Sequence, residues 1–150
     1  MSRCLKNTLP SWIVIKPNAA DVWRYPYLWY RQHGGGETEG RKTRPVAFVA
    51  VLPGKAGGTN LFILAITSTP PGRDRVAVGV PEIESRRAGL DPIPLWVIVD
   101  EYNHDILESS AYFEPAARIG AFSPSFHKKV MSAFIAVVRT GQSKAIPRAD

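Results

Sequence analysis

Arg44, Thr67 and Ser68 carry side chains that could contact a phosphate group. Arg44 separates a charged, glycine-rich segment, residues 33–43, from an apolar run. Its guanidinium stays protonated and can bind two phosphate oxygens at once. Thr67 and Ser68 end another apolar run just before a proline-rich turn, and their hydroxyls can donate hydrogen bonds to the same group. On spacing alone, a solubilising charge at a strand edge explains Arg44 better, and ordinary strand-end and turn residues explain the hydroxyls.

The net charge of +6 is unevenly distributed along the chain. Residues 1–44 carry eight Lys or Arg against three acids, whereas residues 82–108 carry two arginines against seven acids. A basic face opposite an acidic one would suit a polyanion bound on one side only. Solvated surface charge explains an excess of this size equally well, so the charge pattern alone does not identify a ligand.

The motifs of several common enzyme classes are absent from the sequence. The Gly34–Gly36 run is not followed by the lysine and hydroxyl residue of a phosphate loop, and neither His-Glu-x-x-His nor Gly-x-Ser-x-Gly occurs. The three histidines lie in unrelated segments, and the single cysteine, Cys4, has no partner for an internal disulfide. The sequence therefore predicts no metal site and no cofactor. No apolar run reaches the length of a signal peptide core or a membrane span, so we expect a cytoplasmic protein.

Aromatic residues alternate near the start of the chain. Trp23, Tyr25, Tyr27 and Trp29 fall on every second position, and this period predicts a half-buried strand over Asp21–Tyr30. The segment that follows, residues 33–43, has four glycines among charged residues and predicts a long mobile loop.

Short apolar runs further along the chain predict more strands. They cover Val46–Leu52, Leu61–Thr67, Arg75–Val80 and Leu95–Val99. Between the last two runs, Pro81 can begin a short helix that ends at Gly89. The only long helical pattern begins after Ser123, which can cap it, and ends at Gly141.

These elements predict one mainly β domain. A chain of 150 residues with 45% apolar residues can build a single ordinary core. Several short strands and one terminal helix favour a small barrel or roll of antiparallel strands with a C-terminal helix. We expect this domain to cover residues 21–141, preceded by an irregular arm at residues 1–20 and followed by a flexible tail at residues 142–150.

Four segments match the motifs of one known family in their order and spacing. Asp21–Leu28 resembles an opening strand, and Arg44-Pro45 before apolar residues resembles the start of the next. Leu64–Ser68 is similar to an apolar strand that ends in threonine or serine, and Ala88–Glu101 resembles a later strand that ends in an acidic residue. Over residues 21–139 the chain resembles the MazF/PemK-like ribonuclease toxins of type II toxin–antitoxin systems.

The resemblance implies both a fold and an activity. It implies an SH3-like barrel of antiparallel strands with a C-terminal helix, assembled as a homodimer. It also implies a growth-inhibiting toxin, a metal-independent endoribonuclease that cleaves single-stranded RNA through attack by the 2′-hydroxyl. A cognate antitoxin protein would then neutralise it by lying across the RNA groove.

The resemblance also implies roles for particular residues. It reverses the interpretation of Arg44, which becomes the group that stabilises charge on the phosphate, with Thr67 and Ser68 donating to the same phosphate. Glu39 resembles the glutamate of the family's loop, and with Asp100 it is a candidate to carry protons. Residues that could stack on bases or hold phosphates are Tyr27, Trp29, Arg31, Arg41 and Lys42.

Two positions depart from the family's pattern and keep an alternative open. Ala20 precedes the opening strand where the family usually has glycine, and Ile98 stands where some members carry a second catalytic arginine. The alternative is a non-catalytic SH3-like module that binds RNA or a protein partner. Turnover of RNA without added metal distinguishes the two.

Overall fold

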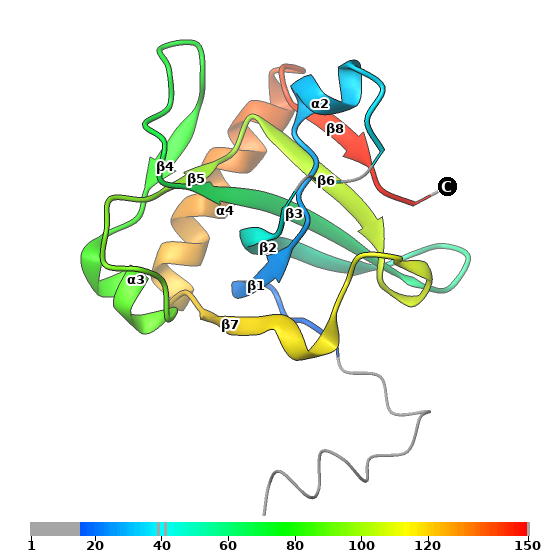
Figure 1. Cartoon of the computed structure of the whole chain (residues 1–150), viewed down its shortest axis with the longest axis horizontal. Coiled ribbons are helices and arrows are strands. Elements are labelled where there is room, and N and C mark those ends of the chain that lie inside the picture. The colour runs from blue at the N-terminus through cyan, green and yellow to red at the C-terminus, as the bar shows by residue number, and fades with distance from the viewer. Residues whose placement is uncertain (1–15, 39, 41, 150) are drawn as a thin grey trace, which may run out of the picture.

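The chain folds into a strongly curved, mainly antiparallel sheet with a long C-terminal helix (Figure 1). The computed structural model describes residues 16–38, 40 and 42–149. In chain order the elements are β1 (Asp21–Tyr25), α2 (Tyr30–Gly34), β2 (Arg44–Pro53), β3 (Thr59–Thr67), β4 (Ala77–Gly79), α3 (Glu82–Arg87), β5 (Trp96–Ile98), β6 (Glu101–Ile106), the 3-10 helices η1 (Leu107–Ser109) and η2 (Pro115–Ala117), β7 (Arg118–Ala121), α4 (Pro124–Arg139) and β8 (Lys144–Pro147).

Strand β3 is the centre of the sheet. It pairs with β2 on one side, and on the other it pairs with β6 through its first half and with β5 through its last two residues. β1 and β7 continue the sheet beyond β2, and β4 continues it beyond β5. The predicted mainly β, barrel-like architecture with a C-terminal helix is therefore confirmed.

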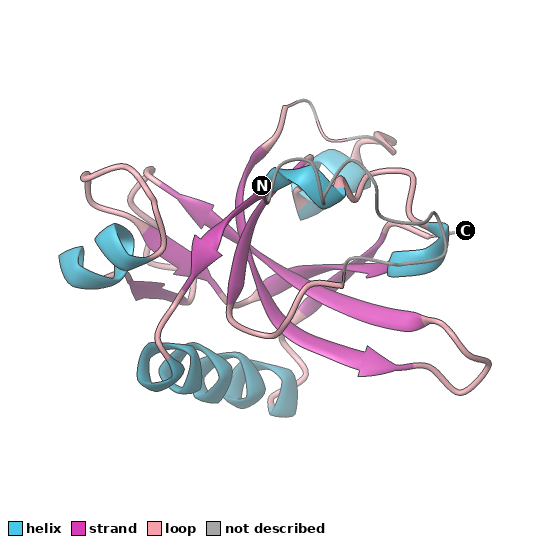
Figure 2. Cartoon of the chain, turned by 90° about the horizontal axis from the view of Figure 1, so that it is seen from below, coloured by secondary structure: helices cyan, strands magenta, loops and turns pink. Residues whose placement is uncertain are grey.

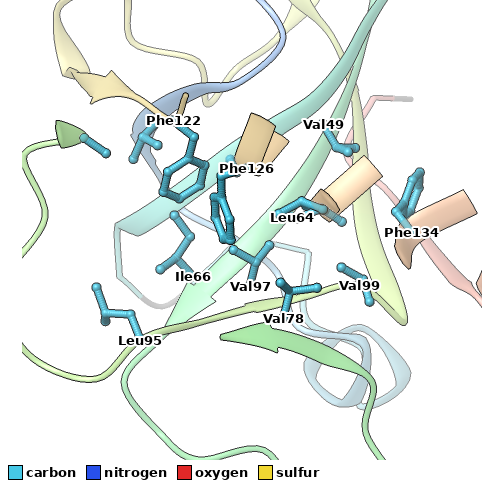
Figure 3. Close-up of a cluster of buried hydrophobic side chains, with 14 of the residues drawn as sticks. Val49, Leu64, Ile66, Val78, Leu95, Val97, Val99, Phe122, Phe126 and Phe134 are labelled. Atoms are coloured by element: carbon cyan, nitrogen blue, oxygen red, sulfur yellow. The ribbon is translucent and has the colours of Figure 1, made fainter. Parts of the chain in front are cut away.

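Alternating side chains of the strands form two hydrophobic cores. On β2, Ala47 and Val49 point to the core beneath α4, whereas Val46 and Phe48 point to an aromatic core on the other face. Figure 2 shows α4 along one face of the curved sheet. Figure 3 shows Phe126 and Phe134 of this helix packed against strand residues such as Leu64.

The C-terminal helix begins and ends close to the predicted positions. The Ser123 side chain caps α4 by accepting a hydrogen bond from the Phe126 N–H, and Pro124 occupies the first turn. Phe126, Val130, Phe134 and Val137 are buried along one side of the helix, as their spacing predicts. The predicted strands and short helix are also present, although β4 is shorter than the expected Arg75–Val80.

The strand predicted over Asp21–Tyr30 ends at Tyr25, so this prediction was wrong in its second half. Pro26 has no N–H to continue the pairing, and Tyr27 N–H instead donates to the Tyr25 carbonyl at 2.8 Å. The alternating aromatic residues remain buried because the irregular segment that follows still covers the aromatic core. Helix α2 then occupies Tyr30–Gly34, which includes the first two residues of the predicted loop.

This irregular segment is bound by three polar side chains of β6 and not by strand pairing. Glu101, Asn103 and Asp105, here called the polar ladder, alternate along the buried face of β6. Asn103 Oδ1 accepts from Leu28 N–H at 2.9 Å, and its Nδ2 donates to the Leu28 carbonyl at 2.8 Å. Tyr25 donates its hydroxyl to Asp105 Oδ2, and Glu101 Oε2 accepts from the Tyr27 hydroxyl and from Tyr30 N–H.

The end of the chain is a strand, so the prediction of a flexible tail over residues 142–150 was wrong. β8 pairs with β6 in parallel, and Ile146 is fully buried. The Arg148 guanidinium is also buried, donates to the Pro26 carbonyl at 3.0 Å and lies 4.0 Å over the ring of Tyr112. One apolar residue and one cation therefore anchor a segment whose composition looks disordered.

The N-terminal arm falls mostly outside the described residues, which begin at residue 16. Residues 16–20 form no helix or strand, and Ala20 has a positive φ of 80°, a conformation that glycine adopts most readily. Its N–H donates to the Phe48 carbonyl, and its own carbonyl accepts from Phe122 N–H. Among the helices of the described chain, none is long and apolar enough to cross a membrane.

Removing the amide of Asn103 should destabilise the fold. In Asn103→Ala, the buried N–H and carbonyl of Leu28 lose their partner, which costs about 2–4 kcal/mol in unfolding free energy. The half-buried Asn60 bonds the ring of His104 through its side-chain oxygen and binds no backbone group of the segment after β1, so Asn60→Ala should cost about 1 kcal/mol or less. Urea titration measures both, and equal losses would contradict a special role for the polar ladder.

Candidate functional site

Six of the residues predicted to form a site line one cavity of about 550 Å³. They come from three places that are distant in the sequence: the segment around α2, the start of β2 and the end of β3. The six are Trp29, Arg31, Lys42, Arg44, Thr67 and Ser68. The structure therefore brings together most of the predicted phosphate-binding groups, and we call this the first cavity.

Arg44 is a partly buried cation with an unsatisfied donor. Its guanidinium lies 5.1 Å over the ring of Trp29, and its buried Nε has no hydrogen-bond partner among the residues that the structure describes. Burial and, secondly, the charge of Arg31 lower the pKa of Arg44 below its usual range. A bound anion would offset the repulsion between Arg44 and Arg31, so the electrostatics favour negative charge beside Arg44.

Trp29 positions the arginines, and its ring is almost fully covered. It is 6% exposed, with Arg31 5.4 Å and Arg44 5.1 Å from the ring and Tyr27 packed edge-on at 5.0 Å. The prediction that Trp29 stacks on a base therefore needs correction: the arginines already cover its ring. Its contribution is to fix the direction of Arg44.

The two predicted hydroxyls stand at the end of β3. Thr67 is buried, and its Oγ1 accepts a hydrogen bond from Thr69 N–H at 3.0 Å. This contact uses an oxygen lone pair and leaves the O–H of Thr67 free to donate. Ser68 is exposed beside it in the cavity wall. Both hydroxyls are therefore available as donors.

Two residues that sequence reasoning missed also line the first cavity. Arg75 and Asp91 come from the segments before β4 and β5, and no sequence motif marks either of them. Among the described lining residues, the cations are Arg31, Lys42, Arg44 and Arg75, and the only acid is Asp91. Arg75 is paired with Asp100 and Glu101 outside this wall, so three cations without such a pairing face one acid among the described residues and the first cavity is cationic.

Asp100 lies in a neighbouring cavity and is paired with Arg75. Arg75 binds both carboxylate oxygens of Asp100, with Nε at 3.0 and 3.2 Å and NH2 at 2.7 Å, and NH2 also donates to Glu101 Oε1 at 2.8 Å. Burial alone would raise the pKa of Asp100, but the hydrogen bonds from Arg75 and Val76 N–H outweigh it and lower the pKa. A carboxylate held in this way is a poor general acid at neutral pH.

Of the remaining predicted residues, Tyr27 does not join the site. Tyr27 is 1% exposed and donates its hydroxyl to Glu101, so its predicted contact with RNA does not agree with its burial in the core. Glu39 and Arg41 lie outside the described residues. Across residues 16–38, 40 and 42–149, no three His, Cys, Asp or Glu side chains are grouped closely enough to hold a metal ion.

Comparisons with known proteins add no relative to this description. No protein-family model, no curated protein and no solved structure matches the chain.

The ion pair of Arg75 with Asp100 should make stability depend on pH. Because the folded state lowers the pKa of Asp100, its stabilising contribution is complete above the unfolded value of about 4 and is lost as pH falls below it. We expect Asp100→Asn to be less stable than wild type at pH 7, and the difference to shrink at pH 3. Urea unfolding at both pH values measures this.

The control is Asp91→Asn, since Asp91 has no ion-pair partner among the described residues. Its difference from wild type should stay nearly constant between the two pH values. A constant difference for Asp100→Asn as well would mean that the ion pair contributes nothing to the acid sensitivity.

Proposed function

We propose that the protein is an endoribonuclease that cleaves single-stranded RNA without a metal ion. The observation that carries the proposal is Arg44, a partly buried cation that lines a cavity together with two further cations, Arg31 and Lys42. A phosphate is the anion that a planar guanidinium fits best, and hydroxyl donors stand in the same wall. The cavity therefore suits the phosphate of a polyanionic chain.

The reaction that fits these groups is transfer of the phosphate within the RNA strand. The ribose 2′-oxygen attacks the adjacent phosphorus and forms a new P–O bond while the bond to the 5′-oxygen breaks. The products are a 2′,3′-cyclic phosphate and a 5′-hydroxyl, with one proton removed from the 2′-hydroxyl and one delivered to the leaving oxygen. Arg44 stabilises the charge that develops on the phosphate, and the hydroxyls of Thr67 and Ser68 donate to the same oxygens.

Two carboxylates are proposed as proton carriers, one from the resemblance and one from the cavity wall. Glu39 is proposed because it resembles the loop glutamate of the MazF/PemK-like family. Asp91 lines the cavity wall and is a second acceptor. The pairing of Asp100 with Arg75 supports a positioning role for Asp100 instead of proton transfer.

The resemblance to the MazF/PemK-like toxins extends this proposal beyond the site. The positive φ at Ala20 occurs where that family usually has glycine, which supports the comparison. On this basis we propose a cytoplasmic toxin that acts as a homodimer and is neutralised by a cognate antitoxin protein. Some members of that family carry a second catalytic arginine at the position of Ile98. Arg75 lines the same cavity as Ile98, so its guanidinium would take the place of that arginine.

A second candidate is a non-catalytic SH3-like module that binds RNA or a protein partner. It is favoured by the state of Asp100, whose carboxylate is fully engaged by Arg75 and Val76. A site without a complete acid–base pair would bind a phosphate and release it unchanged.

Cleavage should depend on Arg44. In Arg44→Ala, the developing phosphate charge loses its main donor, and we expect the cleavage rate to fall by about a hundredfold or more. The measurement is digestion of labelled single-stranded RNA with a chelator present. Arg87→Ala removes an exposed arginine of α3 that lines neither cavity and should cleave at the wild-type rate. Unchanged cleavage by a folded Arg44→Ala protein would show that Arg44 has no part in the mechanism. If the wild-type protein binds RNA but does not cleave it, the non-catalytic module is favoured instead.

RNA binding should weaken with salt because phosphate contacts release counterions. Lys42→Glu reverses a charge in the cavity wall, so the slope of log affinity against log salt should flatten by about 0.7 or more. Lys129→Glu, on the exposed side of α4, should keep the wild-type slope. Fluorescence anisotropy over a salt series gives all three slopes, and equal flattening in both variants would mean that the whole surface attracts RNA.

A further inference from the structure

A second cavity of about 610 Å³ adjoins the first. Its wall is built by α2, the segment before β4, the junction of β5 with β6, and the residues around the start of β8. Arg31 and Arg75 line both cavities, so the two share a wall. The second cavity is therefore a neighbour of the site at Arg44.

The two cavities differ in charge. In the first, Arg31, Lys42 and Arg44 face one acid among the described residues, and the fourth cation, Arg75, is paired with carboxylates outside that wall. In the second, the cations Arg31, Arg75 and Lys144 face the acids Asp74, Asp100 and Glu101. Arg75 already binds two of these acids, so the second cavity is close to neutral. A phosphate is favoured in the first cavity and gains little from the second.

The surface of the second cavity offers an aromatic face beside polar groups. Tyr30 is 45% exposed although the Lys144 ammonium lies 5.5 Å from the centre of its ring, and Val76 is 41% exposed. Tyr30 N–H donates to the buried Glu101 carboxylate at 2.9 Å, so its backbone is fixed. Asp74 and the Gln142 amide supply hydrogen-bond acceptors and donors in the same wall.

A nucleobase has this combination of properties. Its faces are flat and stack on aromatic rings, its edge carries donors and acceptors, and it bears no charge. In a strand, a base follows each phosphate at close range. We infer that the second cavity is a nucleobase-binding subsite, in which Tyr30 stacks on a base next to the phosphate bound at Arg44. This inference rests on the proposed binding of RNA to the first cavity.

The test measures binding, because binding separates stacking from catalysis. The probes are a fluorescein-labelled single-stranded RNA hexamer and versions of it in which one position at a time is abasic. Every probe keeps the same number of phosphates, so differences between probes report on bases alone. The proteins are wild type, Tyr30→Ala, Tyr30→Phe and Arg44→Ala, each checked for an unchanged unfolding midpoint.

We expect Tyr30→Ala to bind the intact hexamer about tenfold more weakly, and Tyr30→Phe to bind like wild type. At one position, the abasic substitution should weaken RNA binding by wild type by a similar factor. It should leave binding by Tyr30→Ala unchanged, because the base and the ring contribute through the same contact. The salt slope should be unaltered in Tyr30→Ala and flatter in Arg44→Ala, since only the latter loses a phosphate contact.

Each other outcome overturns a defined part of the account. If wild type binds and Arg44→Ala does not, but Tyr30→Ala binds normally, the subsite is wrong and the phosphate site stands. If Tyr30→Ala lowers the affinity for every abasic probe as much as the affinity for the intact hexamer, Tyr30 does not contact a base. If wild type binds no RNA, the proposed function fails and the subsite fails with it.

Discussion

The bonds between the polar ladder and residues 25–30 determine where both cavities lie. Pro26 takes this segment out of the sheet, so its buried backbone groups need partners from side chains. Asn103 satisfies both groups of Leu28 across 75 positions of sequence, and Glu101 and Asp105 bind the neighbouring tyrosines. The segment then enters α2 with Trp29 beneath Arg44 and Tyr30 beside the second cavity. Without these bonds, neither aromatic residue would have a fixed place.

Glu101 connects this arrangement to the electrostatics of the site. It is 4% exposed and accepts from Tyr27, Tyr30 and Arg75, so three donors stabilise its charge. Arg75 in turn neutralises Asp100, at the point where pairing to β3 passes from β5 to β6. Asp100 and Glu101 therefore share one arginine as their ion-pair partner. Arg44 has no acidic partner among the described residues, and this separation of charge distinguishes the two cavities.

Local patterns in the sequence predicted the elements whose burial follows a simple period. β2 and β3 alternate between two cores, and α4 has a capping serine, a proline in its first turn and one apolar side, so each was predictable from its own residues. Arg44 is the first residue of β2 and Thr67 is the last residue of β3, so both site residues were predictable for the same reason. A strand end fixes where its side chains point, and the resemblance added their chemistry.

The remaining elements depend on partners that are distant in the sequence. β6 places acids and an amide on its buried face, so its pattern argues against a core strand until Tyr25–Tyr30 is present to bind them. β8 is a strand only because β6 offers an unpaired edge and a space for Ile146. Arg75 belongs to the same group: nothing around it marks a site, yet the junction of β5 with β6 presents two carboxylates to it. Buried polar contacts of this kind are invisible to hydrophobic periodicity, and here they position the site.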